Sequence, residues 1–208
     1  ESRFDRFRPT VRQRWREQPG PGSGIWFDLG SHLVDQTIRL FGLPKAVTAR
    51  CLPMRDDSKT TDYFHVLLHY KNLEVILHGS SFSAAPNTRF RLEGSKGSFV
   101  KYGLDPQEQQ LKNGASPNDS CYGLEAEQDF GCFYSEYSSE LIKTEPGCYQ
   151  QYYAEISNAI ESGADNPVSP EDAVNVLKIL ELAEKSSAKG TTLSVPKSLS
   201  NRADLATS

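Results

Sequence analysis

One short segment of the sequence combines an acid and a histidine at a spacing that suits proton transfer. Residues 24–35 read Gly-Ile-Trp-Phe-Asp-Leu-Gly-Ser-His-Leu-Val-Asp, which puts Asp28 and His32 four residues apart near the expected start of a helix. Residues at that spacing share one helical face. Histidine is the usual proton-transfer group near neutral pH, and a nearby carboxylate orients it. The spacing alone fits two interpretations equally: a catalytic pair, or a helix cap followed by a packed histidine.

A glycine-rich run precedes this segment and invites comparison with a nucleotide-binding loop. Residues 20–24 read Gly-Pro-Gly-Ser-Gly, without the G-x-G-x-x-G spacing and without an apolar strand before them. Both features are needed for a dinucleotide loop, and the lysine of a phosphate-binding loop is also missing. We therefore expect a turn here, and no cofactor-binding residues in this chain.

Basic residues are concentrated near the N-terminus. Six arginines fall in the first sixteen residues: Arg3, Arg6, Arg8, Arg12, Arg14 and Arg16. A phosphate or nucleic-acid patch is one interpretation. Because Glu1, Asp5 and Glu17 are interleaved, a solvated or ion-paired face is favoured. The net charge of −4 also argues against nucleic acid as a partner.

Three histidines fall at positions that alternate along two expected strands. His65, His69 and His78 share one face of a sheet if residues 60–70 and 73–80 are strands. A metal site is one interpretation, but no carboxylate is evident among them. The favoured interpretation is an amphipathic face that packs against another subunit. A metal site at His32 and Asp35 also lacks further ligands, so no metal is expected.

Composition limits the class of protein. With 208 residues, the chain is long enough for one full core, expected over residues 1–196, with a polar tail over 197–208. No apolar run is long enough to cross a membrane, and the N-terminus lacks the apolar core of a signal peptide. The four cysteines show no CxxC pairing, which favours reduced thiols and a cytoplasmic protein. The first residue is not Met, so a fragment of a longer protein is expected.

The hydrophobic pattern predicts an α+β protein. One helix is expected over 31–41, ended by Gly42, a second over 149–162, and a third that begins at Pro170 and ends before Gly190. Expected strands cover 2–8, 45–54, 60–70, 73–80, 89–93, 98–102 and 191–195. Residues 103–147 are polar and weakly periodic, so they are expected to form an elaborated excursion from the sheet. Strands in a run with helices before and after predict an open, mostly antiparallel sheet with its helices on one face.

At these residues the chain resembles the C-terminal domain of the Gfo/Idh/MocA family of NAD(P)-dependent oxidoreductases. The family pattern D-x-G-x-H-x-x-D is matched by Asp28, Gly30, His32 and Asp35, followed by an apolar helix that ends in glycine. The resemblance continues through the hairpin at 93–98 and the helix introduced by residues 167–173. It implies a fold like that of the C-terminal domain of dihydrodipicolinate reductase.

The resemblance also implies an enzymatic activity that needs residues outside this chain. Family enzymes hold NAD or NADP in an N-terminal Rossmann domain, which also supplies a lysine to the catalytic group. His32 would act as general acid/base on a substrate hydroxyl, and Asp28 would position the substrate or the histidine. The chain would be the substrate-binding half of a sugar or cyclitol dehydrogenase, inactive by itself.

Further expectations concern the substrate, the partners and an alternative function. Arg14, Trp15, Arg16 and Tyr152 are candidates to line the substrate pocket, although their spacing does not prove it. A small polyol or sugar is the expected substrate, and the open sheet commonly forms the subunit interface in such proteins, so a homo-oligomer is expected. The alternative is a non-catalytic ligand-binding or oligomerisation module that keeps the oxidoreductase fold.

Overall fold

The computed structural model describes residues 1–199 and divides into two compact units. The first unit contains residues 1–87 together with the C-terminal segment that begins at Pro170, and the second contains residues 88–169. Most of the predicted polar tail, 197–208, lies outside the described residues. Within residues 1–199, no helix is both long and apolar enough to span a membrane.

The first unit is built on five strands in the order β1-β4-β3-β2-β9. β1 runs parallel to β4, and the other neighbours are antiparallel. The strands are β1 (Ser2–Arg3), β2 (Ala46–Leu52), β3 (Tyr63–His69), β4 (Glu74–Ser80) and β9 (Leu193–Ser194). The predicted hairpin at residues 71 and 72 therefore joins β3 to β4, with His65 directly opposite His78.

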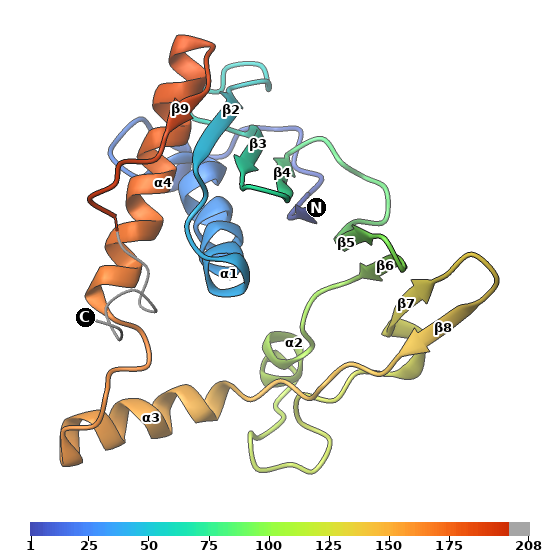
Figure 1. Cartoon of the computed structure of the whole chain (residues 1–208). Coiled ribbons are helices and arrows are strands. Elements are labelled where there is room, and N and C mark those ends of the chain that lie inside the picture. The colour runs from blue at the N-terminus through green and yellow to red at the C-terminus, as the bar shows by residue number, and fades with distance from the viewer. Residues whose placement is uncertain (200–208) are drawn as a thin grey trace. The chain divides into compact units, whose positions relative to one another are not determined.

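Two helices cover one face of this sheet, α1 (Ser31–Phe41) and α4 (Pro170–Lys189) (Figure 1). Alternate residues of β3, namely Phe64, Val66 and Leu68, are fully buried beneath them. Trp26 is also fully buried, and its indole N–H donates to the Leu180 carbonyl at 3.1 Å. The prediction of an α+β fold with helices on one face is confirmed, and the period-2 and period-3.6 patterns explain it.

The first helix begins earlier than the sequence predicts. Helical backbone starts at Gly24 and passes through a π-helical turn, Trp26–Gly30, before α1. The Ile25 N–H donates to the Thr61 carbonyl at 2.7 Å, which fixes this start against the sheet layer. At Gly30 a Cβ would lie 2.2 Å from the Trp26 ring, so only glycine permits this packing. Asp28 consequently lies inside a helical turn and is not an N-cap.

The N-terminal strand is shorter than predicted, although its backbone remains extended. The N–H groups of Phe4, Arg6 and Arg8 donate to the carbonyls of His78, Ser80 and Ser81. The acceptor advances by two residues in the first step and by one in the second, so the regular ladder does not continue to Arg8. The segment therefore runs beside β4 and the residue that follows it.

The second unit contains four antiparallel strands in the order β8-β7-β6-β5. Its strands are β5 (Thr88–Gly94), β6 (Gly97–Tyr102), β7 (Gly131–Tyr134) and β8 (Ser139–Ile142), and its helices are α2 (Gln107–Lys112) and α3 (Tyr149–Ser162). The excursion expected over 103–147 contains α2 and the β7–β8 hairpin, two features that the sequence pattern did not predict. Both strands of that hairpin have four residues, too few for a clear hydrophobic period.

Candidate functional site

Asp28 is held by a neighbouring arginine at the edge of the helical layer. It lies in the π-helical turn, and its Oδ1 is 3.0 Å from Arg16 Nε. Arg16 belongs to the short 3-10 turn Trp15–Glu17, and its guanidinium stacks 4.8 Å from the centre of the Trp15 ring. The Asp28 side chain keeps 30% of its surface exposed, so a ligand can still reach it. Single π-helical turns inside helices recur at functional sites.

His32 lies on α1, directly after the π-helical turn, and is exposed. Among residues 1–199, no side chain forms a hydrogen bond or ion pair with it, and that includes Asp28. The histidine is therefore not a packed residue of the first turn, and the interpretation as a cap plus a packed histidine is wrong on both counts. An exposed imidazole with free ring nitrogens can exchange a proton with a bound molecule, and catalytic hydrogen bonds often tighten only when a substrate is present.

A small cavity of about 30 Å³ adjoins Asp28. Its lining combines charged and hydroxyl side chains with two apolar ones: Arg6, Arg8, Glu17, Ile25, Asp28, Leu29, Arg55, Ser80 and Ser81. A cavity of about 10–15 Å³ holds one water molecule, so this one accepts a small polar group but not a whole sugar ring. Burial, together with the charges of neighbouring arginines, lowers the pKa of Arg8 from its ordinary value. Arg8 therefore lines the cavity in a partly buried position close to other positive charges.

A buried ion-pair network lies behind this cavity. Arg55 Nε is 2.9 Å from Asp62 Oδ2, and both side chains are almost completely buried. The same guanidinium donates to the carbonyls of Arg8 and Thr10 at 3.1 and 3.2 Å, and its Nη2 is 3.4 Å from Glu17 Oε2. The network therefore connects the loop after β2 to the arginine-rich N-terminal segment.

The sequence pattern did not predict Arg55 or Asp62 as site residues, and it indicated Glu17 only as an acid interleaved with the arginines. Arg55 stands in the polar run Met-Arg-Asp-Asp-Ser-Lys at 54–59, which is typical of a solvated loop. Its carbonyl partner Arg8 is 47 residues away, and Asp62 is seven residues away across the loop. The only available signal was an acid inside the strand expected over 60–70, and that signal is weak.

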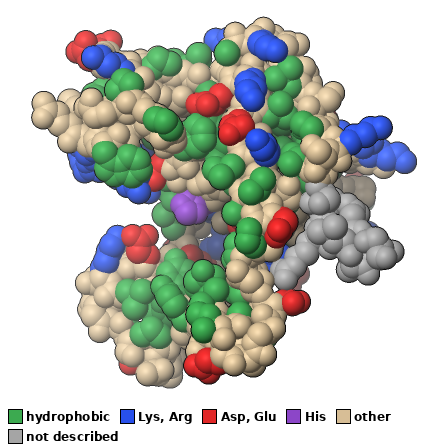
Figure 2. Space-filling model, turned by 90° about the vertical axis from the view of Figure 1, so that its left-hand side faces the viewer, with side chains coloured by type: hydrophobic (Ala, Val, Ile, Leu, Met, Phe, Trp, Pro, Cys, Tyr) green, Lys and Arg blue, Asp and Glu red, His purple; other side chains and the backbone are tan. Residues whose placement is uncertain are grey.

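The arginine-rich segment is partly ion-paired, as the interleaved acids predicted. Arg3 pairs with Asp5 at 3.0 Å, and Arg16 pairs with Asp28 at the same distance. On the face seen in Figure 2, Lys and Arg side chains are interspersed with Asp and Glu side chains. The predicted turn at residues 20–24 is also confirmed, since the Ser23 N–H donates to the Gly20 carbonyl. No dinucleotide loop is formed there.

The four candidate substrate-binding residues are distributed over both units. Arg16 contacts Asp28, and Trp15 stacks on Arg16 with 68% of its surface exposed. Arg14 directly precedes this 3-10 turn and is exposed. Tyr152 belongs to α3 of the second unit, where its ring lies 5.5 Å from that of Tyr153. The structure thus places Arg16 against Asp28 and Trp15 against Arg16, whereas Tyr152 belongs to the other unit.

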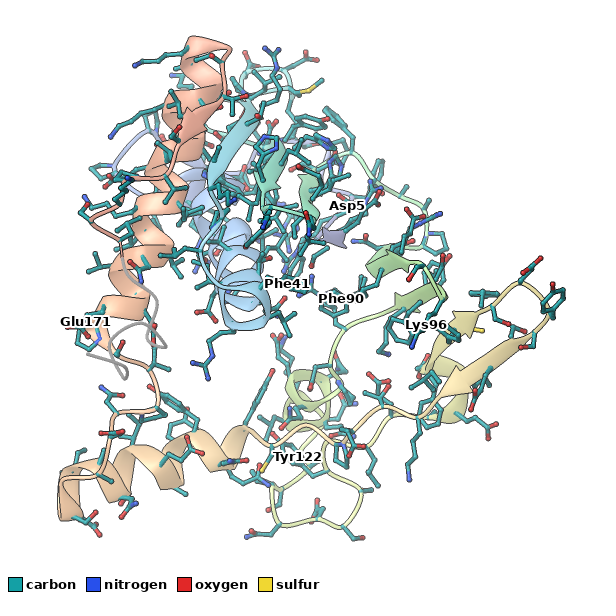
Figure 3. The ribbon with its side chains drawn as sticks, in the orientation of Figure 1. Asp5, Phe41, Phe90, Lys96, Tyr122 and Glu171 are labelled. Atoms are coloured by element: carbon teal, nitrogen blue, oxygen red, sulfur yellow. The ribbon has the colours of Figure 1, made fainter. Side chains whose placement is uncertain are left out.

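The three strand histidines lie on the sheet face opposite the helices. His78 Nε2 is 3.4 Å from the buried Asp5 (labelled in Figure 3), and its ring is 5.6 Å from His65. Burial lowers the pKa of His78, and the nearby Asp5 carboxylate offsets this only in part. His69 contacts the Thr48 hydroxyl at 2.7 Å and Glu74 at 2.9 Å. Within residues 1–199, no group of three or more His, Cys, Asp or Glu side chains is arranged to hold a metal ion.

All four cysteines are free thiols: Cys51, Cys121, Cys132 and Cys148. Burial and the charge of Glu184 raise the pKa of Cys51 to about 12, so this thiol is unreactive near neutral pH. Cys121 and Cys148 are exposed. None of the four adjoins Asp28 or lines the cavity.

The sequence of this chain is similar to those of known oxidoreductases. The family described as "Oxidoreductase family, C-terminal alpha/beta domain" matches residues 1–195. The chain is 46% identical over 195 residues to the uncharacterized oxidoreductase YdgJ of Escherichia coli K12, covering 93% of this chain and 56% of that protein. It is 41% identical over 194 residues to IolW of Bacillus subtilis, named scyllo-inositol 2-dehydrogenase (NADP(+)), covering 91% of this chain and 54% of that protein.

Solved structures agree with the sequence comparison. The putative oxidoreductase yvaA from Bacillus subtilis superposes with a TM-score of 0.88 at 38% identity, covering 94% of this chain and 56% of that one. A putative oxidoreductase from Klebsiella pneumoniae superposes with a TM-score of 0.83 at 39% identity, covering 93% and 54%. The chain spans about half the length of the curated relatives it matches.

Proposed function

Because the chain belongs to the Gfo/Idh/MocA oxidoreductase family, in which it matches the C-terminal α/β domain, we propose that it binds the substrate of an NAD(P)-dependent dehydrogenase. The substrate class is a sugar or cyclitol whose hydroxyl group is oxidised. Support for that class comes from IolW, whose name gives scyllo-inositol and NADP(+). The observation that carries the proposal is the exposed His32 placed just after Asp28, which is itself held by Arg16.

This chain contributes the proton-transfer side of the reaction. His32 accepts the proton of the substrate hydroxyl through its free imidazole nitrogen. Asp28, fixed on one side by Arg16, keeps its second oxygen for a neighbouring hydroxyl of the substrate or for the imidazole. A nicotinamide cofactor, held elsewhere in the full-length protein, would supply the acceptor for the hydride that leaves the carbon bearing this hydroxyl. The turn at 20–24 does not fit a dinucleotide, so the cofactor is held by residues outside this chain.

The test is a His32→Ala substitution in the full-length protein that carries this chain. Turnover of scyllo-inositol with NADP⁺, and with NAD⁺ in parallel, is measured for the wild type and the variant. General acid/base catalysis contributes about 10²–10⁴ in rate, so we expect a loss in that range. Arg39→Ala, an exposed residue of the same helix, is the matched control and should keep wild-type turnover. A His32→Ala enzyme within a few-fold of wild type would show that His32 is not the proton-transfer group.

We also propose that the full-length protein forms a homo-oligomer through the open face of the sheet. The face opposite the helices carries the half-buried Leu67 and Ile76 beside the three histidines. Apolar side chains among polar ones on an uncovered sheet are typical of a subunit interface. Multi-angle light scattering of the full-length protein at micromolar concentration should give at least a dimer. A clean monomer, or a Leu67→Glu variant that assembles unchanged, would contradict this assignment of the face.

A further inference from the structure

Three residues, Asp62, Arg55 and Glu17, form a chain of ion pairs from the buried core toward the turn that carries Arg16. Asp62 is fully buried and accepts from the backbone N–H groups of Met54 and Arg55 at 2.6 and 3.2 Å. The Arg55 side chain then pairs with the same carboxylate. With this many partners in a dry environment, the orientation of the Arg55 guanidinium is fixed.

Arg55 in turn contacts both ends of residues 8–17. Its Nη1 donates to the carbonyls of Arg8 and Thr10, at the start of this stretch. Its Nη2 contacts the Glu17 carboxylate at the far end. Glu17 also accepts the Arg12 backbone N–H at 2.6 Å, which closes the loop between the two ends. One buried guanidinium therefore determines the path of residues 8–17.

The consequence appears at the neighbouring residue, Arg16. Glu17 ends the 3-10 turn that carries Arg16, so anchoring Glu17 limits where the Arg16 guanidinium can reach. That guanidinium is 3.0 Å from Asp28 and has 53% of its surface exposed. An exposed arginine has many rotamers available, and restricting its backbone reduces the entropy that the ion pair must overcome.

We infer that Glu17 and Arg55 are positioning residues that act on Asp28 through Arg16. The inference rests on the proposed role of Asp28 at the substrate. Asp62 acts behind them by holding the Arg55 guanidinium, and the cavity beside Asp28 is lined by both Glu17 and Arg55. A positioning role differs from a structural one because its effect on the reaction disappears once Arg16 is removed.

A double-mutant cycle in the full-length protein tests this. Glu17→Gln keeps an acceptor for the Arg12 N–H but removes the charge that faces Arg55, and Arg16→Gln removes the partner of Asp28. Small misplacements of a reacting group cost up to about 10²-fold in rate, so we expect each change alone to lower kcat/KM ten- to hundredfold. The double variant should fall no further than the lower single variant. Additive losses would overturn the inference, because they would mean that Glu17 acts independently of Arg16.

Further variants keep the result interpretable. Arg16→Lys retains a positive charge and should recover part of the activity that Arg16→Gln loses. Glu93→Gln removes an exposed acid of the second unit and is the control for loss of one negative charge. Glu17→Gln should lower the melting temperature only modestly, because Arg55 keeps Asp62 and two backbone carbonyls as partners. Unfolding of this variant at the assay temperature would indicate a structural role instead. If Asp28→Asn leaves turnover unchanged, the proposed function fails. If Asp28→Asn lowers turnover but Glu17→Gln does not, only the positioning role fails.

Discussion

The two ends of the ion-pair network beside the cavity use the same chemistry in opposite environments. At the inner end, Arg55 and Asp62 pair at 2.9 Å with side-chain exposures of 2% and 0%. At the outer end, Arg16 and Asp28 pair at 3.0 Å with exposures of 53% and 30%. A buried pair is costly to break because the remaining charge has no water around it, whereas an exposed pair contributes little to stability. The comparison separates residues that hold the fold from residues that are available to a substrate.

Breaking the inner end should give the largest effect on stability. Asp62→Ala leaves the Arg55 guanidinium buried without its main partner and also frees two backbone N–H groups. We expect the free energy of unfolding to fall by about 3–5 kcal/mol. Urea denaturation followed by circular dichroism measures this. Asp56→Ala, an exposed acid in the same loop, is the matched control and should change stability by less than about 0.5 kcal/mol. A loss below about 1 kcal/mol at Asp62 would remove the distinction between the two ends.

The second largest effect is expected where the core supports the turn that carries Asp28. In Gly30→Ala, the new Cβ would lie 2.2 Å from the fully buried Trp26 ring, so the ring or the π-helical turn must move. Overpacking of this kind costs about 1–3 kcal/mol. Gly20→Ala provides the control, because no atom lies within 4 Å of the Cβ it would add. The measurement is thermal unfolding of both variants, and equal melting temperatures would show that Trp26 does not constrain the turn.

Breaking the Arg16–Asp28 pair should lower stability less than Asp62→Ala or Gly30→Ala does. Its clearest effect should be on turnover. Arg16→Gln removes an exposed pair, for which the expected loss is about 0.2–1 kcal/mol. The same substitution should lower kcat/KM of the full-length enzyme, since Asp28 loses its fixed partner. Denaturation and steady-state kinetics on one preparation check both. A variant that is strongly destabilised but fully active would reverse the comparison.

The smallest effect is expected at His78, on the sheet face opposite α1 and α4. It is a dependence of the free energy of unfolding on pH. Burial lowers the pKa of His78 below its ordinary value of 6.5, while Asp5 and Glu1 favour its charged form and Arg3 and His65 oppose it. The unfolded chain therefore binds more protons than the folded one in the window below pH 6.5, and the free energy of unfolding should decrease as the pH falls through that window. In His78→Gln this part of the slope should be absent. Denaturation curves from pH 7.5 to 5.0 provide the measurement, and identical slopes for both proteins would contradict the assignment to His78.

Local sequence patterns were sufficient for most of the elements. The period of 3.6 predicted α1 with its end at Gly42, and alternation predicted β3 and β4 with the hairpin between them. The composition of residues 20–24 predicted a turn and excluded a dinucleotide loop. Each of these follows from interactions between residues close together in the chain, which propensity, capping and turn chemistry describe well.

The sequence by itself determined the α+β class, the helix that carries His32, and the presence of an acid four residues before it. Only the tertiary structure decided that the helix begins at Gly24, that Asp28 pairs with Arg16, and that Arg55 connects Asp62 to the arginine-rich segment. The β7–β8 hairpin belongs to this second group, because its strands are too short to show a period. The physical reason is the same in each case. Local patterns record which face of an element is buried, whereas an ion pair between distant residues depends on where the whole chain has folded.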